Sequence, residues 1–285
     1  MALSYVAAGS SAGGTTSINV PHPAGLQAGD MLLLWVTNKY PASGPSTPSG
    51  WTRIHQRSGG SGLSGVDSGT VYLTVYSKIA NGSESGNQNV IIISGNSSVG
   101  KMICIRKPND ASWLVVGAAE GTIITPATNE SALLALAGGS TTTPLKLLEG
   151  DFIAIGYGIN SDGQTFSSYT LTTIGTLRAS SLTEFADDPT TSGDDTKIAG
   201  AYCTVTSGAL MGQPTFNLTA SATLTNAPCG AVIAVILRVD APENRVPIAR
   251  KRTNIIYTRK MPRGVPRVTR PRNTSAPDMD ELLGR

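Results

Sequence analysis

The feature that most constrains the fold is a Gly-Asp pair followed by a short apolar run, and it occurs twice. Gly29-Asp30 precedes the apolar residues 31–36, and Gly150-Asp151 precedes residues 152–157, at an offset of 121. Each run is too short for a helix of a globular protein and is typical of a buried strand entered from a turn. The repetition predicts two related β-units in one chain.

Other strand-like segments follow the two runs in the same order. Tyr202 corresponds to Tyr76 at an offset of 126, and Gly230 corresponds to Gly100 at an offset of 130. Offsets that grow steadily are expected for a duplication with small loop insertions. Charged residues make up only 14% of the chain and there are 32 glycines, which favours short strands and turns over helices. We therefore expect an all-β fold with two related antiparallel β-sandwich units of jelly-roll type, in tandem or merged.

The C-terminal residues 241–285 differ from the rest in charge. Residues 1–240 carry 11 Lys or Arg against 15 Asp or Glu, whereas residues 241–285 carry 11 against 4. Prolines interrupt these cations, so the segment cannot form a long helix or a core of its own. We expect β-units at residues 1–120 and 121–240, followed by an extended basic arm at 241–285 that becomes ordered on a partner.

The arm has the composition of a segment that docks on other protein subunits. Ten Lys or Arg residues between positions 245 and 272 would also bind phosphate groups in a strongly salt-dependent way. However, Tyr257 is the only aromatic residue of the arm, and single-stranded nucleic acid is usually bound by stacking on several aromatics. Protein docking is favoured, and contact with nucleic acid stays open. The candidate docking residues are Arg250, Lys251, Arg252, Ile255, Ile256, Tyr257, Arg259, Lys260, Leu282 and Leu283.

Motifs for catalysis are weak throughout the chain. His22 and His55 have no cysteine or histidine partner at a metal-binding spacing. Residues 9–13 fit the G-x-S-x-G pattern of a nucleophile elbow, but no helix-forming segment follows them. Asp30 and Asp151 invite comparison with the two carboxylates of a glycosidase, yet an aspartate in a Gly-Asp turn usually caps its own backbone. We expect no catalytic residue, no enzyme activity and no cofactor.

Two small groups of residues are candidates for ligand contact. Trp51 and Trp113 are candidate aromatics for stacking on a glycan, and the alternative for Trp51 is a core or rim position beside a short strand. An acidic cluster provides candidate ligands for calcium, although its spacing does not match an EF-hand and a solvated loop is the alternative. The cluster consists of Asp187, Asp188, Asp194 and Asp195.

The cysteines and the apolar runs indicate in which cellular compartment the protein matures. Cys104, Cys203 and Cys229 are odd in number and lie among apolar or small residues, which favours buried free thiols and maturation in a reducing cytosol. Residues 3–8 are too short for the apolar region of a signal peptide, and no run reaches the roughly 18 apolar residues of a membrane span. We expect no insertion into membranes.

Residues 15–107 resemble β-sandwich domains of tailed-bacteriophage virion proteins. The resemblance lies in the Gly-Asp turn with its apolar strand, the Pro/Gly-rich loop into Gly50-Trp51-Thr52, and the strand that ends with residues 76–80, Tyr-Ser-Lys-Ile-Ala. Such domains recur in tail fibres, baseplates and head decorations. The resemblance implies a non-enzymatic virion protein and carries over no catalytic residue.

Together, these observations predict a bacteriophage structural protein that is assembled in the host cytoplasm and forms homo-oligomers. Its β-body would be exposed on the virion as a head decoration or tail component, and its arm would anchor it to neighbouring virion subunits. The alternative is a receptor- or glycan-binding module of a tail fibre or baseplate that contacts host surface glycan. The sequence has no heptad or collagen-like shaft, which counts against a fibre. Whether the two units form one sandwich or two is left open.

Overall fold

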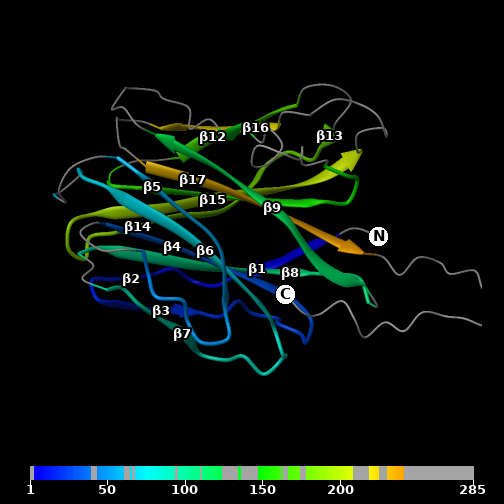
Figure 1. Cartoon of the computed structure of the whole chain (residues 1–285), viewed down its shortest axis with the longest axis horizontal. Helices are drawn as coiled ribbons and strands as arrows, with labels where there is room; N and C mark the ends of the chain where they lie inside the picture. Colours follow the sequence, from blue (N-terminus) through cyan, green and yellow to red (C-terminus); the bar gives the residue numbers. More distant parts are fainter. Residues whose placement is uncertain are drawn as a thin grey trace, which may run out of the picture. The chain divides into compact units, whose positions relative to one another are not determined.

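The computed structural model shows an antiparallel all-β body (Figure 1). Its strands form two six-stranded sheets, one three-stranded sheet and one two-stranded sheet. Among the described residues, no helix has the length and hydropathy of a membrane span. The arm at 241–285, with all its candidate docking residues, lies outside the described part, as does Cys229. The structure describes residues 3–39, 44–60, 65, 68–93, 96–109, 111–123, 134–135, 147–161, 163, 166–173, 178–207, 218–224 and 230–240.

The first six-stranded sheet is built around β4 (Met31–Lys39), the strand that follows the first Gly-Asp turn. β4 pairs with β6 (Val71–Ile79) on one side and with β8 (Ser98–Arg106) on the other. The strand order is β1-β8-β4-β6-β5, and β2 also pairs with β8. Every residue of β4 is buried, because both faces of the sheet are covered. The remaining strands are β1 (Ser4–Ala8), β2 (Ala12–Gly14) and β5 (Thr52–Gly59).

The second six-stranded sheet is built around β11 (Phe152–Ile159), which follows the second Gly-Asp turn. β11 pairs with β15 (Thr196–Ser207) and with β17 (Gly230–Asp240). The strand order is β13-β15-β11-β17-β9, and β14 also pairs with β15. The remaining strands are β9 (Ser112–Ile123), β13 (Arg178–Ala179) and β14 (Thr183–Thr190). The boundary expected at 120/121 lies inside β9, and the first sheet ends at Arg106.

A smaller sheet covers the outer face of each large one. β3 (Ser17–Pro21) and β7 (Asn87–Ile91) cover the first, and a core that includes Ile18, Leu34 and Tyr76 fills the space between them. The second is covered by β10 (Leu134–Ala135), β16 (Leu218–Leu224) and β12 (Phe166–Thr173). Each half of the chain is therefore a β-sandwich of its own.

The two halves share one topology. The order β1-β8-β4-β6-β5 of the first sheet is matched by β9-β17-β11-β15-β14 of the second, and the pair β3-β7 is matched by β10-β16. β12 and β13 are additions between β11 and β14. The prediction of an all-β fold made of two related antiparallel β-sandwich units is confirmed.

The strand registers correct the alignment of the two halves. Ile79 lies opposite Met31 and Thr204 lies opposite Phe152, so β6 and β15 correspond at an offset of 125 rather than 126. The partners in β8 and β17, Ile105 and Leu237, give 132 rather than 130.

A slip of one residue moves a side chain to the opposite face of a sheet. Accordingly, Tyr76 lies in the outer core of the first unit, whereas Tyr202 packs against the core between the two large sheets. The two tyrosines are not counterparts, contrary to the sequence alignment.

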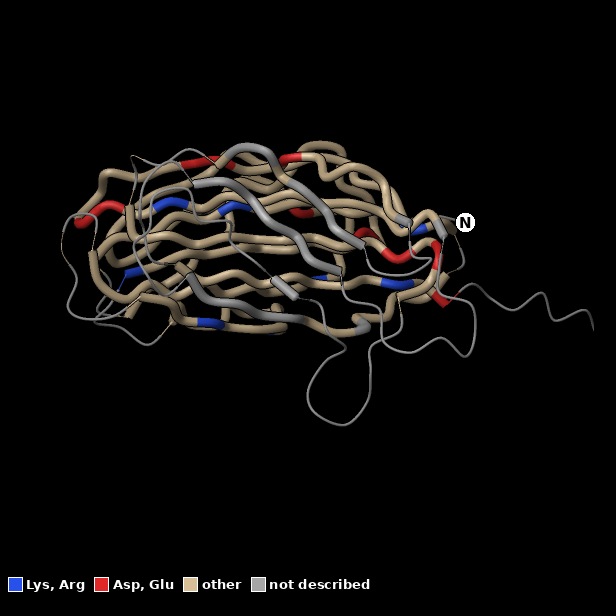
Figure 2. The backbone as a smooth tube through the Cα atoms, turned by 90° about the horizontal axis from the view of Figure 1, so that it is seen from above, with Lys and Arg blue, Asp and Glu red and all other residues tan. Residues whose placement is uncertain are grey.

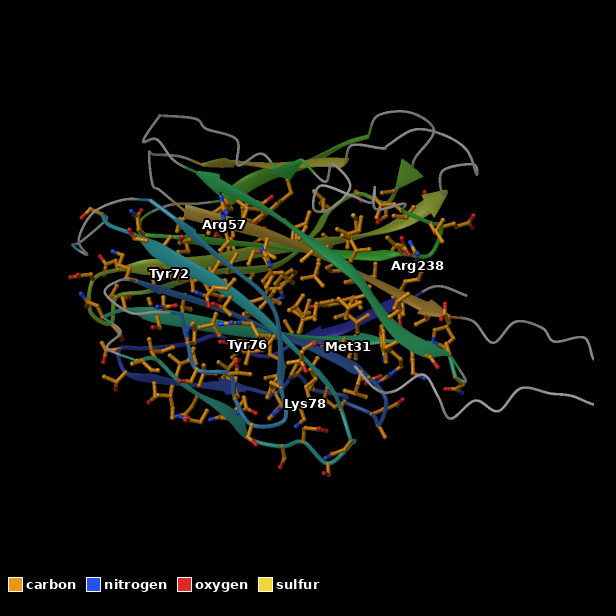
Figure 3. The ribbon with its side chains drawn as sticks, in the orientation of Figure 1. Met31, Arg57, Tyr72, Tyr76, Lys78 and Arg238 are labelled. Carbon is orange, nitrogen blue, oxygen red and sulfur yellow. The ribbon has the colours of Figure 1, made fainter. Side chains whose placement is uncertain are left out.

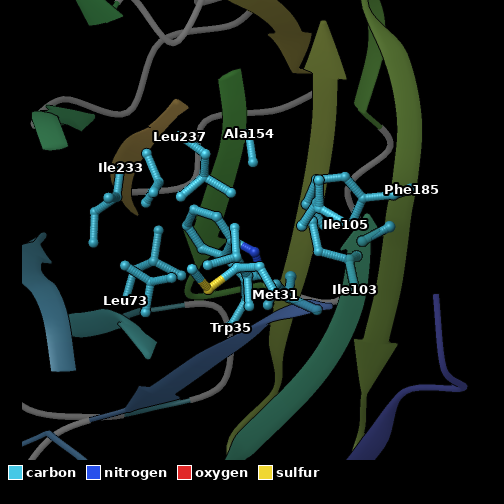
Figure 4. Packing of buried hydrophobic residues seen from close by; sticks show 14 of the residues in the cluster. Met31, Trp35, Leu73, Ile103, Ile105, Ala154, Phe185, Ile233 and Leu237 are labelled. Atoms are coloured by element: carbon cyan, nitrogen blue, oxygen red, sulfur yellow. The ribbon is translucent and has the colours of Figure 1, made fainter. Parts of the chain in front are cut away.

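The two large sheets pack face to face and share a core (Figure 4), so the two units are merged. Trp35 of β4 lies over Gly156 of β11, where a Cβ atom would be 2.5 Å from the indole Cε3 atom. Thr37 lies in the same way over Gly158. In both cases a residue contacts its own counterpart at an offset of 121, which is the geometry expected close to a two-fold axis relating two equivalent units.

Candidate functional site

The most regular polar feature of the body is the Gly29-Asp30 turn. Gly29 has a φ of +90°, a conformation that glycine adopts without steric cost. The Asp30 carboxylate accepts a hydrogen bond of 2.9 Å from the Gln27 N–H. The Gly29 N–H donates to the Ala80 carbonyl and the Ala80 N–H donates to the Asp30 carbonyl, both at 2.8 Å. These bonds fasten the turn to the end of β6.

Arg106, at the end of β8, holds the Asp30 carboxylate from the other side. Its Nε atom lies 2.9 Å from Oδ1 and its Nη2 atom 2.7 Å from Oδ2, which is a bidentate ion pair. The Asp30 side chain is only 3% exposed. Burial alone would raise the pKa of Asp30, but hydrogen bonds from Arg106, the Gln27 N–H and the Cys104 thiol outweigh it, so the pKa is lowered.

The second turn repeats this arrangement. Gly150 has a φ of +89°, and the Asp151 carboxylate accepts a hydrogen bond of 2.8 Å from the Leu148 N–H. The Gly150 N–H donates to the Val205 carbonyl and the Val205 N–H donates to the Asp151 carbonyl, both at 2.9 Å. Arg238 of β17, labelled in Figure 3, forms the bidentate pair, with Nε–Oδ1 and Nη2–Oδ2 distances of 2.7 Å. The Asp151 side chain is fully buried.

These two pairs define what the repeated aspartates do. Every oxygen of both carboxylates accepts a hydrogen bond from a guanidinium, and one oxygen of each also caps the turn. Both carboxylates are therefore engaged by donors of the protein itself. The arrangement fixes the start of the central strand to the end of the strand beside it, as the turn interpretation of Asp30 and Asp151 predicted.

The arginine partners were missed in the sequence, although a signal was present. Arg106 follows an apolar run in β8, and Arg238 follows an apolar run in β17. Each run is the last strand of its unit. An arginine directly after the apolar run of the last strand, Arg106 in one half and Arg238 in the other, pairs with the aspartate that precedes the central strand of the same half.

Trp51 is buried, so it is not placed for stacking on a sugar. Its side chain is 6% exposed and belongs to the core beneath β3 and β7. Its indole N–H donates a hydrogen bond of 2.9 Å to Oε1 of Gln88. The ring fills the outer core of the first unit, as the core interpretation of Trp51 predicted, and the glycan contact of Trp51 is corrected accordingly.

Trp113 joins the two units. It lies on β9 of the second sheet, is half-buried against the shared core, and donates a hydrogen bond of 2.7 Å from its indole N–H to the Gly29 carbonyl. A second contact between the units is a stack of aromatic rings. Tyr5 of β1 stacks on Tyr202 at 4.4 Å, and Tyr202 stacks on Phe152 at 5.3 Å.

The four candidate calcium ligands do not form a metal site. Within the described residues, no group of three or more His, Cys, Asp or Glu side chains is placed to hold a metal ion. Asp187 pairs with Nζ of Lys197 at 2.7 Å, and Asp188 pairs with Nζ of Lys101 at 2.9 Å. The other two members of the cluster are Asp194, which accepts a hydrogen bond from the Asn96 amide, and Asp195, which also makes polar contacts.

The cluster instead contributes to the contact between the units. Lys101 lies on β8 of the first sheet, and Asp188 lies on β14 of the second, so their ion pair links the two sheets. Asn96 and Asp194 form a second link, with the Asp194 N–H donating to Oδ1 of Asn96 at 3.0 Å. Figure 2 shows the charged residues as short, scattered segments between long uncharged stretches of the body.

Comparison of the chain with protein-family models, with curated proteins and with solved structures finds no match.

Proposed function

We propose that this chain is a non-enzymatic structural protein of a bacteriophage virion, a head decoration or tail component. In this proposal, the duplicated β-body is exposed on the particle. The basic arm, residues 241–285, anchors it to neighbouring subunits.

The observation that carries the proposal is the segregation of charge along the chain. The body, residues 1–240, has four more acidic than basic residues, whereas the arm has seven more basic than acidic residues. Inside the body, the charged groups at the repeated positions are used to tie strands together, as the Asp30–Arg106 and Asp151–Arg238 pairs show. A body whose polar groups serve its own rigidity, followed by a basic arm, suits a module that is attached to a surface.

The bacteriophage assignment comes from the resemblance of residues 15–107 to virion β-sandwich domains. The merged double sandwich supports it in a general way. Two large sheets that share one core form a stiff body, and such a body can be displayed without a partner covering it. The receptor- or glycan-binding alternative loses support, because Trp51 lies in the core and the indole N–H of Trp113 is bound to the Gly29 carbonyl.

Removal of the arm tests the proposal. Particles are assembled with the full chain or with a chain that ends at Asp240, the last residue of β17. The copy number of each in purified particles is measured by quantitative mass spectrometry. We expect the truncated chain to be lost from particles. Incorporation at the same copy number as the full chain would overturn the anchoring role.

A matched variant keeps the length of the arm and lowers only its net charge, from +7 to +2. Replacement of the five cations Arg250, Lys251, Arg252, Arg259 and Lys260 with glutamine leaves the spacing of the arm unchanged. If docking is electrostatic, this variant is also lost from particles. If it is retained while the truncated chain is lost, the arm acts through its apolar residues instead.

A further inference from the structure

We propose that the arm of one copy binds along β14 of a neighbouring copy, with residues 250–260 extended beside the acidic edge of the second large sheet. This inference rests on the proposed function, in which the arm anchors the body to its neighbours. It adds the place where the arm binds and the identity of the neighbour, a second copy of this chain.

β14 (Thr183–Thr190) is an edge strand. In the described part of the chain, β15 is the only strand that pairs with it. It carries Glu184, Asp187 and Asp188, and the turn that follows it carries Asp194 and Asp195. The edge of a sheet presents backbone groups that are not used in the ladder, and an extended segment can bind there by adding to the sheet.

The first unit supplies an internal control for the charge of this edge. β5 corresponds to β14, because both pair with equivalent strands and both have a β-bulge at the same position, between Arg53 and His55 in β5 and between Glu184 and Ala186 in β14. In this register Arg53 is the counterpart of Glu184. The same backbone thus carries a cation in one unit and an anion in the other.

β5 and β14 also carry opposite charges at a second pair of equivalent positions, Arg57 and Asp188. Arg57 lies opposite Leu73, and Asp188 lies opposite the counterpart of that leucine, Ile198. The fold accepts either sign of charge at these positions. The acidic residue at the Glu184 position is therefore not a requirement of the sandwich, and a function in recognition accounts for it, whereas Asp187 and Asp188 also form ion pairs within the body.

The acidic edge retains a negative field after its own ion pairs are counted. Lys101 and Lys197 pair with Asp188 and Asp187, and among the described residues no ion pair involves Glu184 or Asp194. Glu184 is exposed, and its pKa is raised, first by partial desolvation and then by the charge of Asp187, although Lys197 opposes this. The region therefore attracts a cationic segment.

Residues 250–260 of the arm have the complementary pattern. Arg250-Lys251-Arg252 and Arg259-Lys260 flank residues 253–258, Thr-Asn-Ile-Ile-Tyr-Thr. Threonine, isoleucine and tyrosine are residues that favour strands. Ile255 lies fifteen positions after Asp240, and an extended chain of that length spans roughly 50 Å, enough to reach an adjacent subunit.

A photo-crosslinking experiment on the full chain tests this directly. Tyr257→p-benzoyl-phenylalanine is prepared in heavy-isotope and light forms, treated with nuclease, mixed, irradiated and analysed by mass spectrometry. We expect crosslinks from position 257 to β14 that join heavy to light chains. Crosslinks within one chain, crosslinks to other strands, or crosslinks to nucleic acid alone would each overturn the proposal.

A charge-reversal pair provides the second readout. Glu184→Lys on β14 should reduce heavy–light crosslinking at least several-fold. Salt well above physiological strength should do the same to the chain that carries only the crosslinker at position 257. The matched control is Arg53→Glu at the equivalent position of β5, which should leave crosslinking unchanged. Equal loss in both variants would overturn the assignment to β14. Crosslinking to β14 that persists in Glu184→Lys would also overturn the assignment. If that variant aggregates at all salt concentrations as well, the acidic edge serves only against aggregation.

The crosslinking experiment and the particle-incorporation experiment can fail independently of each other. Loss of the truncated chain from particles, without crosslinks to β14, would leave anchoring intact and remove only the binding place. Retention of the truncated chain would remove the anchoring role whatever the crosslinks show.

Discussion

Trp35 of β4 packs on Gly156 of β11, which is its own counterpart in the second unit. The contact joins the two central strands of the body, and it exists only because one of the two equivalent positions is large and the other has no side chain. The duplication has diverged where its two copies meet.

This contact predicts that Gly156→Ala is destabilising. The added Cβ would lie 2.5 Å from the Trp35 ring, closer than atoms can pack, so the indole or the strand has to shift. Overpacking of this kind typically costs about 1–3 kcal/mol in the free energy of unfolding. Denaturant unfolding measures it. The control is Gly163→Ala, where a Cβ meets no atom within 4 Å, and equal stability of the two variants would contradict the packing.

The two Asp–Arg pairs predict that removing each one lowers the free energy of unfolding, and that the two decreases are additive. Asp30→Asn leaves Arg106 without its ionised partner, and removal of one member of a buried pair costs about 3 kcal/mol. Asp151→Asn should have a similar effect through Arg238. Because the two pairs belong to different large sheets, the double variant should show the sum within about 0.5 kcal/mol. Asp240→Asn, at an exposed position, is the control that should leave unfolding unchanged.

The lowered pKa of Asp30 predicts a dependence of stability on pH. A carboxyl group whose pKa is lower in the folded state stabilises the fold fully above its unfolded pKa of about 3.9, and this contribution is lost as the pH falls through the folded pKa. Unfolding measured between neutral pH and strong acid should therefore show a steeper loss for the natural chain than for Asp30→Asn. Parallel curves for the two proteins would show that Asp30 does not contribute in this way.

The buried cysteines predict slow thiol chemistry. Burial raises the pKa of Cys203 to about 12, and burial together with the nearby Asp30 carboxylate raises that of Cys104 to about 12. Since the thiolate is the reactive form, iodoacetamide at neutral pH should leave both unmodified in the folded protein and modify both in denaturant. Peptide mass spectrometry distinguishes the two sites. Rapid modification of either cysteine without denaturant would contradict its burial.

The sequence predicts the central strands and their turns because those features are local. A glycine, an aspartate and an apolar run are adjacent, and each turn folds with the bonds expected of it. The partners of the aspartates are not local: Arg106 is 76 residues from Asp30 and Arg238 is 87 residues from Asp151. Such pairs follow from strand order, which the hydrophobic pattern alone does not determine.

The strand register and the burial of Trp51 were also not predicted correctly in full from the sequence. The one-residue error between β6 and β15 arose because a tyrosine in each half was taken as equivalent, although insertions in the intervening loops had shifted the offset. Trp51 follows a Pro/Gly-rich loop, a position that is often exposed, yet its indole is inserted beneath β3 and β7 and held by Gln88. Its burial depends on the covering sheet, whose strands come from distant parts of the chain.

The central claim, a virion protein whose body is displayed and whose arm is anchored, is tested most directly by locating the chain on an intact particle. Purified particles are imaged by electron cryo-microscopy after a compact tag is inserted at Gly163, which is exposed on the body. We expect tag density at regular positions on the outer surface of the head or tail, at a fixed number of copies per particle. Particles that contain no copies of the chain, or that carry the tag only in their interior, would contradict it.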